Sequence, residues 1–338
     1  MDYSRRDFTK IALAGLPSAY AFLHGGIASA ATQARPNSKW AGVQVGMNVP
    51  YNFSTGNYTA GDVILKRCVD LGVSGVELRA QPVELFMGSP AAVAAAAAAG
   101  APRGGGGARG AAADPAAQKA AADETRKWRM GASLDRVKAF RKTWDDAGVL
   151  IEIVKWDGIF DFSDEELDYA FEVSRALGAR ALSSEISIGK TKRLGQFADK
   201  HKMQVGYHGH TAVTPAIWEA TFAEAKYNAA NLDIGHFVAG NNTSPVPFLK
   251  QYPDRITHIH VKDRKMHEGA NVDFGTGDTP IKEVLRLMRD NKWNIQATIE
   301  FEIPAPPAAD GSRGSWTQEQ RTEQIAKCIA YCKECLLT

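Results

Sequence analysis

Three stretches decide the fold of this chain: NLDIGHF (231–237), RITHIHVKDR (255–264) and QATIEFE (296–302). Each begins as an apolar run of β type and ends in carboxylate or imidazole side chains. A fourth stretch of this kind, MQVGYHGH (203–210), lies just upstream. Five of the chain's eight histidines fall in these four stretches. Such groups at the ends of successive buried strands are what a divalent-metal site on a (β/α)8 barrel requires.

The rest of the chain extends the same alternation of strand and helix. Apolar-rich strands are predicted at 43–48, 73–79, 149–154, 180–185, 203–208, 230–234, 256–261 and 295–301. Amphipathic helices are predicted between them, including 132–147, 165–177, 215–227, 280–291 and 317–337. Eight strand–helix repeats indicate an α/β fold, a closed parallel (β/α)8 TIM barrel, rather than an open sheet.

The bulk composition excludes some classes of protein. The 338 residues carry 40 basic and 38 acidic side chains, a net charge of +2, so no nucleic-acid partner is expected. No apolar run beyond the N-terminal region reaches the length of a membrane span, so we expect no membrane association after export.

The N-terminus has the pattern of a twin-arginine export signal. Ser4-Arg5-Arg6-Asp7-Phe8-Thr9-Lys10 precedes an apolar stretch and the small-residue cleavage motif Ala28-Ser29-Ala30. Residues 1–30 are therefore predicted to be a signal peptide read by the twin-arginine export machinery. Residues 31–338 are predicted to form one TIM-barrel domain that is periplasmic or secreted.

Residues 88–123 interrupt the alternation after the second predicted strand. They are almost all Ala, Gly, Pro and Ser, with eight alanines among residues 91–99. A disordered low-complexity insertion is the simpler interpretation. A lid or an arm between subunits is the alternative, with Arg126, Trp128 and Arg129 at its base facing substrate.

The cysteines favour packing over chemistry. Cys328, Cys332 and Cys335 are spaced along one helical face, while Cys68 stands alone. A metal site would need a fourth nearby ligand, so a small buried stripe is predicted. Cysteines on one helical turn also rarely form good disulfides.

Each chemistry-bearing residue lies at or just beyond the carboxyl end of a predicted strand. Asp233 and His236 follow the sixth strand, His260 ends the seventh and Glu300 the eighth, while His208 and His210 share one parity on the fifth. A mixture of oxygen and imidazole ligands suits Mn²⁺, Zn²⁺, Co²⁺ or Fe²⁺ better than Ca²⁺.

These motifs resemble the sugar isomerase/epimerase superfamily with the xylose isomerase-like barrel. The residues that carry the resemblance are Y-H-x-H at 207–210, L-D-x-G-H at 232–236 and H-x-H-x-K-D at 258–263. They are most similar to those of inosose dehydratase-like and secreted 3-keto-sugar-processing members. The resemblance implies a divalent cation, Mn²⁺ by preference, held by Asp233, His260, Glu300 and a ligand from the fifth strand.

The fifth-strand ligand departs from the pattern of many epimerases. They carry glutamate at this position, whereas this chain has His208, and so resembles the dehydratase-like members. Glu185 on the fourth strand is the alternative source of a carboxylate ligand. Glu185 is otherwise a candidate general base. The family position of His236 implies contact with substrate.

Other residues are predicted to support the reaction. Lys262 has inward parity and suits a developing alkoxide, with an ion pair to Asp263 as the alternative, and His210 is expected to serve substrate. His258 is interpreted as a supporting or core residue, one layer deeper. Weaker pocket candidates are Asn48, Glu77, Arg79, Lys155 and Trp156. Gly275-Thr276-Gly277 is predicted to be a tight turn rather than a phosphate loop.

Such a site removes a proton next to a carbonyl. The leading hypothesis is a metal-dependent isomerase or epimerase that acts on a free sugar or keto-sugar through an enediolate. Elimination of a 3-keto-glycoside, or dehydration, uses the same ligands and is the main alternative. A metal-dependent endonuclease would need more ligands and a basic surface. A periplasmic sugar-binding protein would show a damaged ligand set. Barrels of this kind often dimerise, so a homodimer is also expected.

Overall fold

The computed structural model of the protein describes residues 35–100 and 115–338. All the elements below lie in one compact unit, Pro36–Thr338. The predicted export signal, residues 1–30, lies outside the described residues, as do residues 101–114 of the insertion.

Eight parallel strands close into a barrel, as predicted. Their order is β2-β11-β8-β7-β6-β5-β4-β3, and pairing of β3 with β2 closes the ring. Every predicted strand is present, with each end within two residues of its predicted position. The barrel strands are β2 (Val43–Val49), β3 (Gly75–Arg79), β4 (Leu150–Lys155), β5 (Ala181–Glu185), β6 (Gln204–His208), β7 (Asn228–Asp233), β8 (Ile256–Val261) and β11 (Gln296–Ile299).

Three short strands lie outside the ring of eight. β1 (Lys39–Trp40) pairs antiparallel with β2. β9 (Asp263–Arg264) and β10 (Asn271–Val272) form a two-stranded hairpin directly after β8. This hairpin therefore belongs to the βα loop that follows β8.

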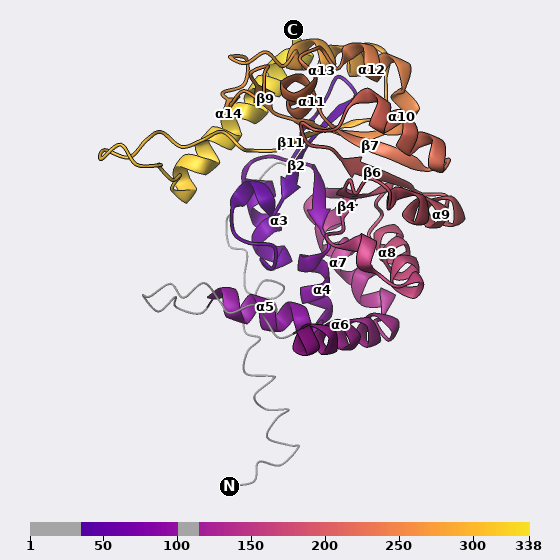
Figure 1. The fold of residues 1–338 in the computed structure, drawn as a ribbon. Helices are drawn as coiled ribbons and strands as arrows, with labels where there is room; N and C mark the ends of the chain where they lie inside the picture. The colour runs from indigo at the N-terminus through magenta and orange to yellow at the C-terminus, as the bar shows by residue number, and fades with distance from the viewer. Residues whose placement is uncertain (1–34, 101–114) are drawn as a thin grey trace, which may run out of the picture. The chain divides into compact units, whose positions relative to one another are not determined.

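Helices cover the outside of the barrel; in Figure 1, α8, α9 and α10 lie outside strands β4, β6 and β7. The helices are α3 (Gly61–Asp70), α4 (Gln81–Met87), α5 (Pro90–Gly100), α6 (Pro115–Met130), α7 (Leu134–Ala147), α8 (Asp164–Ala176), α9 (Thr191–His201), α10 (Pro215–Glu224), α11 (Ile234–Asn241), α12 (Val246–Gln251), α13 (Ile281–Asp290) and α14 (Gln318–Leu337), with 3-10 turns at Tyr51–Phe53, Ile159–Asp161 and Pro253–Arg255.

Local sequence sets several of the helix starts. Ser163 and Glu166 form a reciprocal capping box at the start of α8. Thr317 and Gln320 do the same for α14. These caps satisfy backbone N–H groups that the first helical turn leaves without partners, so the helices begin where the predicted strand–helix rhythm requires.

Large aromatic side chains fill the layer between strands and helices. Trp144, Trp156 and Trp218 are at most 2% exposed. Trp156 donates a hydrogen bond from its indole N–H to Ser174 on α8 and packs edge-on against Tyr169. The prediction that Trp156 lines the pocket is therefore wrong, because its ring points outward from the barrel into this packed layer.

The described parts of the insertion are helical rather than disordered. Residues 90–100 form α5 and residues 115–130 form α6. Arg129 pairs with Glu84 at 2.8 Å and with Glu166 at 2.9 Å, and its guanidinium lies 4.3 Å from the ring centroid of Phe162. Alanine-rich sequence favours helix, and these ion pairs anchor α6 to α4 and α8.

The expectation that residues at the base of the insertion face substrate is also wrong. Arg126 pairs with Glu166 at 3.2 Å, and Trp128 packs against the hydrophobic core. Together with Arg129 these side chains hold α6 in place. They anchor the insertion and leave substrate contacts to other residues.

The C-terminal cysteines form the predicted buried stripe. Cys328, Cys332 and Cys335 are buried on α14 against the core, and they and Cys68 are free thiols.

Among the described residues, no single helix is long and apolar enough to cross a membrane. One pair of helices bent by 110°, Gln81–Met87 with Pro90–Ala99, passes by length and composition when both are counted together.

The anchoring of α6 gives a first testable prediction. Replacing Arg129 with Met leaves the carboxylates of Glu84 and Glu166 short of positive charge in a nearly buried position, which we expect to cost about 3 kcal/mol in the free energy of unfolding. The matched control is Lys138→Met, because the Lys138 side chain is 65% exposed where it pairs with Asp135. Chemical denaturation should show a change of at most about 1 kcal/mol for the control. Equal effects in the two variants would contradict the anchoring role.

Candidate metal centre

The four predicted ligands converge at one end of the barrel. Each of His208, Asp233, His260 and Glu300 offers an atom, and these atoms all lie within 4.8 Å of one another. His208 and Asp233 are the last residues of β6 and β7, His260 is the second-last residue of β8, and Glu300 directly follows β11. All four side chains are buried. The carboxyl ends of four neighbouring strands thus bring together residues spread over 93 positions of sequence.

The two carboxylate oxygens of Asp233 have different roles, one in capping a helix and one in the ligand group. Oδ1 accepts a 2.7 Å hydrogen bond from the backbone N–H of His236 and so caps α11. Oδ2 is buried and accepts no hydrogen bond of acceptable geometry from the described residues, although Lys262 Nζ lies 3.0 Å away. The helix cap therefore holds the side chain and leaves the second oxygen facing the ligand group.

A residue on the neighbouring strand β2 orients Glu300 at the barrel mouth. Asn48 on β2 donates a 2.9 Å hydrogen bond to Glu300 Oε1. Glu300 Oε2 lies 3.3 Å from His260 Nδ1 and 2.6 Å from Lys262 Nζ. Asn48 is thus a buried partner of a ligand, consistent with its predicted position at the pocket.

The unpartnered atoms fit a cation. Within the described residues, His208 Nδ1, Asp233 Oδ2 and His260 Nδ1 are buried without a hydrogen-bond partner. Buried polar atoms normally have a partner, and three such atoms in one four-residue group match the donor set of a divalent metal.

The electrostatics of the ligands follow from this crowding. Burial opposes charge on His260, but the carboxylates of Glu300 and Glu77 outweigh burial and raise its pKa to about 10. Burial also disfavours charge on Glu300, yet His260 and Lys262 hold the pKa of that carboxyl well below its usual range. Burial lowers the pKa of His208 well below its usual value, with His260 adding to the effect, so its imidazole is neutral.

Lys262 lies at the centre of the acidic cluster. Its ammonium contacts Asp233 Oδ2 at 3.0 Å, Glu300 Oε2 at 2.6 Å and Glu302 Oε2 at 2.7 Å. These carboxylates outweigh burial and raise the pKa of Lys262 above its ordinary value. The alternative that Lys262 pairs with Asp263 is wrong, because adjacent residues on a strand point to opposite faces.

Glu185 and His210 form a pair at the edge of the ligand group. Glu185 Oε1 contacts Lys155 Nζ at 2.5 Å, and Oε2 lies 3.1 Å from His210 Nε2. Although burial favours the protonated acid, His210, His208 and Lys155 lower the pKa of Glu185 far below its usual value, and the pKa of His210 is raised in turn. The His210 side chain is 63% exposed because β6 ends at His208, so this pair is open to solvent.

His236 lies between the ligand group and the loop after β8. Its ring stacks at 4.8 Å on His210, and its Nδ1 lies 2.7 Å from the Arg264 guanidinium. Burial lowers the pKa of His236, Asp233 opposes the shift, and Lys262 and His210 add to it, which leaves a neutral imidazole. His236 and His210 thus form an aromatic edge beside the four ligands.

Two rim residues received no role from the sequence. Tyr51 donates a 2.6 Å hydrogen bond to Glu302, which also contacts Lys262, so both extend the acidic cluster outward. Glu302 stands two residues past Glu300 with the same parity, and that spacing was the available signal. Arg79 is paired with Asp157 and lies over the Tyr51 ring, where it borders the mouth of the barrel.

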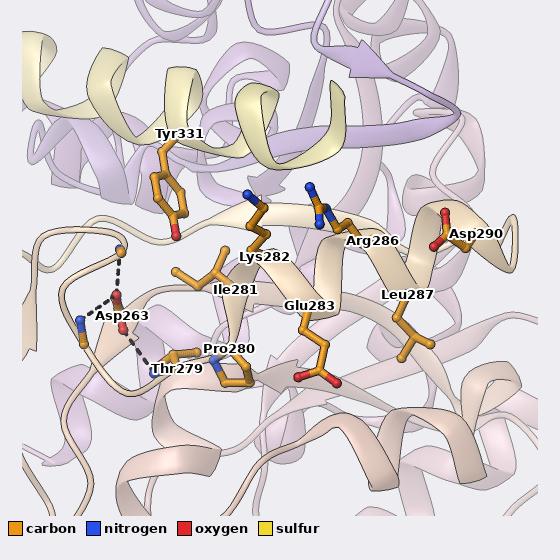
Figure 2. A pocket seen from close by; sticks show the side chains of 12 residues that line it. Asp263, Thr279, Pro280, Ile281, Lys282, Glu283, Arg286, Leu287, Asp290 and Tyr331 are labelled. Atoms are coloured by element: carbon orange, nitrogen blue, oxygen red, sulfur yellow. Dashed lines mark hydrogen bonds between the residues drawn. The ribbon is translucent and has the colours of Figure 1, made fainter. Parts of the chain in front are cut away.

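Asp263 organises the loop that follows β8. Its carboxylate accepts hydrogen bonds from the backbone N–H groups of Gly275 (2.8 Å), Gly277 (2.9 Å) and Thr279 (3.2 Å), drawn as dashed lines in Figure 2. The predicted tight turn at 275–277 is confirmed, and its physical cause is this carboxylate. A cavity of about 600 Å³ borders the loop beneath α13 and Tyr331, but none of the four predicted ligands lines it.

Comparisons with known proteins agree with this architecture. Residues 188–335 match the family model described as "Xylose isomerase-like TIM barrel". A xylose isomerase domain protein from Planctomyces limnophilus superposes with a TM-score of 0.55 at 15% identity, covering 88% of this chain and 97% of that one. The described residues therefore have the TIM-barrel fold of that protein, and the family model matches the second half of the barrel.

Two further relatives of this TIM barrel are named for dehydratases. The structure of a probable 3-DHS dehydratase from Bacillus anthracis superposes with a TM-score of 0.55 at 11% identity, covering 85% of this chain and 99% of that one. An inosose dehydratase from Clostridium botulinum is 27% identical over 133 residues, which cover 32% of this chain and 44% of that protein. The barrel thus matches less than half the length of this curated relative.

The Asp263 turn supplies the second prediction. A Cβ on Gly277 would lie 1.9 Å from Asp263 Oδ1, so Gly277→Ala should displace the carboxylate and lower the free energy of unfolding by about 1–3 kcal/mol. Gly131→Ala is the matched control, since its Cβ would meet only Trp128 O at 3.8 Å. Thermal and chemical unfolding should change by no more than about 0.5 kcal/mol for the control. A stable Gly277→Ala variant would show that the loop does not depend on the Asp263 contacts.

Proposed function

We propose that this protein is a divalent-metal-dependent isomerase or epimerase that acts on a free sugar or keto-sugar through an enediolate. The observation that carries the proposal is the convergence of His208, Asp233, His260 and Glu300, three of which present buried atoms without a hydrogen-bond partner among the described residues. Mn²⁺ is the metal we propose first, and Zn²⁺, Co²⁺ and Fe²⁺ suit the same donors.

Elimination or dehydration of a keto-sugar is a second candidate function. The specific observation in its favour is the 27% identity to an inosose dehydratase over 133 residues, a match that covers 44% of that relative. The two reactions share their first half, in which a proton leaves a carbon next to a carbonyl. They differ in whether a proton returns to carbon or a neighbouring C–O bond breaks.

The export signal bears on the substrate. Residues 4–10 carry the twin-arginine pattern, and we propose that the mature protein is periplasmic or secreted. Phosphorylated sugars are scarce outside the cytoplasm, which favours an unphosphorylated carbohydrate. The four ligands would hold the cation, and a bound divalent cation supplies positive charge that stabilises negative charge developing on substrate oxygen.

The chain's own residues supply the proton transfers. Glu185 is the last residue of β5 and Lys262 follows β8, which lies three strands further round the barrel. The two groups therefore reach substrate from separate parts of the rim. We assign Glu185, held by Lys155 and His210, to removal of the proton from carbon. Lys262 donates hydrogen bonds to the substrate oxygen that gains charge, while His236 and His210 bind hydroxyl groups along their stacked edge.

The direct test of this function is product analysis. The mature protein with Mn²⁺ should convert a member of a panel of free sugars and 3-keto-glycosides in D2O, with deuterium entering the carbon next to the carbonyl. NMR of the products distinguishes an epimer or isomer from an eliminated or dehydrated product. Metal analysis should show about one divalent cation per chain.

The variants for that test separate the site from the fold. Asp233→Asn should lose the cation and the deuterium exchange together, because it removes a ligand charge. His267→Asn is the control, since His267 is an exposed histidine with a left-handed φ of 59° that asparagine tolerates. A wild-type protein without a stoichiometric cation, and an Asp233→Asn variant with unchanged activity, would refute the proposal.

Glu185 gives a separate prediction that distinguishes base from ligand. Glu185→Gln should lower kcat by about 10²–10⁴-fold, the usual contribution of a general base, while the metal content stays at the wild-type level. His208→Gln should do the opposite and first reduce the metal content. Loss of the cation from Glu185→Gln would instead place this carboxylate among the ligands.

A further inference from the structure

A buried carboxylate beneath the metal centre has no role in the reaction described above. Glu77 on β3 is 0% exposed, and its Oε2 lies 2.6 Å from His260 Nε2 while its Oε1 lies 3.3 Å from His258 Nε2. Strands β3 and β8 are not neighbours in the barrel, so these contacts cross its interior. The prediction that Glu77 lines the pocket is therefore wrong, because the carboxylate is enclosed below the ligand group.

The short contact decides which nitrogen of His260 carries a proton. A carboxylate oxygen 2.6 Å from Nε2 is favourable only if that nitrogen is an N–H donor, since two lone pairs at this distance repel each other. With Nε2 as the donor, Nδ1 is the nitrogen whose lone pair a bound cation would take. Nδ1 is the nitrogen that lies 3.3 Å from Glu300 Oε2, within the ligand group.

The second histidine does not compete for this hydrogen bond. Thr257 Oγ1 donates to the carbonyl of Ala230 at 3.1 Å and lies 2.8 Å from His258 Nδ1. The single hydroxyl hydrogen is used on the carbonyl, so His258 Nδ1 must be the donor to Thr257. His258 Nε2 and Glu77 Oε1 are both buried without a hydrogen-bond partner among the described residues. Glu77 therefore receives a hydrogen bond from His260 alone.

We propose that Glu77 is a positioning residue that holds His260 with Nδ1 toward the ligand group and thereby strengthens binding of the divalent cation. This inference rests on the proposed function, because it requires a cation at His208, Asp233, His260 and Glu300. A carboxylate on the far nitrogen of a metal-bound histidine fixes both ring orientation and tautomer, and it increases the basicity of the ligand. Loss of such a partner typically weakens metal binding by about 10–100-fold.

The test measures cation affinity rather than turnover. Zn²⁺ and Mn²⁺ dissociation constants are determined by chelator competition for the wild type, Glu77→Gln and Glu77→Asp. We expect Glu77→Gln to weaken binding by about 10–100-fold, and Glu77→Asp, which keeps the charge, to recover part of it. The matched control is Glu152→Gln on the adjacent strand β4, because Glu152 pairs at 3.0 Å with Arg180 and not with a ligand. Its affinity should match that of the wild type.

A spectroscopic readout keeps the inference testable even if Glu77→Gln fails to fold. In ¹H–¹⁵N spectra of the wild-type protein loaded with Zn²⁺, the His260 ring should be protonated at Nε2 with Nδ1 as the ligand; His260→Gln identifies its signals. Protonation at Nδ1 would overturn the inference, as would wild-type affinity in Glu77→Gln. A wild-type protein that binds no cation would instead overturn the proposed function, so the two failures are distinguishable.

Discussion

Neutralising buried negative charge at the carboxyl end of the barrel is the constraint on which the rest of the structure depends. Glu77, Asp233 and Glu300 are at most 5% exposed, and unpaired charge in such a position costs several kcal/mol. The chain answers with Lys155 and Lys262, which are almost as deeply buried. Three of its histidines (His208, His258 and His260) are also buried in this interior. Most TIM-barrel interiors are filled by branched apolar side chains, so this polar interior is a departure that the packed outer layer must support.

That support comes from the packed layer outside the barrel and from the loop after β8. The tryptophans between strands and helices bury large apolar areas, and Arg129 ties α6 to α4 and α8 through two carboxylates. The loop after β8 is fixed by Asp263, which lets Arg264 reach His236 and Asn271 reach Glu302. Rigid placement of loops by a carboxylate and by helix caps keeps the site side chains in position, since a misplaced ligand weakens metal binding and catalysis alike.

The strands could be predicted because parallel strands read as apolar runs, and polar groups were expected together because strand ends meet at one rim. The choice of Asp233, His260 and Glu300 as ligands, with His208 or Glu185 as the fourth, came from the resemblance to the sugar isomerase/epimerase superfamily. What could not be predicted was pairing across the interior, since no periodicity connects Glu77 with His260, 183 positions later. For Lys262 the sequence suggested only the adjacent Asp263 as an ion-pair partner, because the three carboxylates that contact it follow other strands. Residues 88–123 were predicted to be a low-complexity insertion from their composition, although alanine also favours helix.

Lys262 and a bound cation would compete for the same carboxylate oxygens, those of Asp233 and Glu300. The third partner of Lys262, Glu302, is outside this competition. Its ammonium contacts Asp233 Oδ2 and Glu300 Oε2, and Asp233 Oδ2 is one of the buried atoms left for a ligand. If the proposed cation takes those two carboxylates, like-charge repulsion disfavours the ammonium in its present place. Glu302, at 2.7 Å and hydrogen-bonded to Tyr51, then keeps the charge of Lys262 paired at the side that opens toward the rim. Glu302 is thus the partner that the Lys262 ammonium would keep when a cation takes the other two carboxylates.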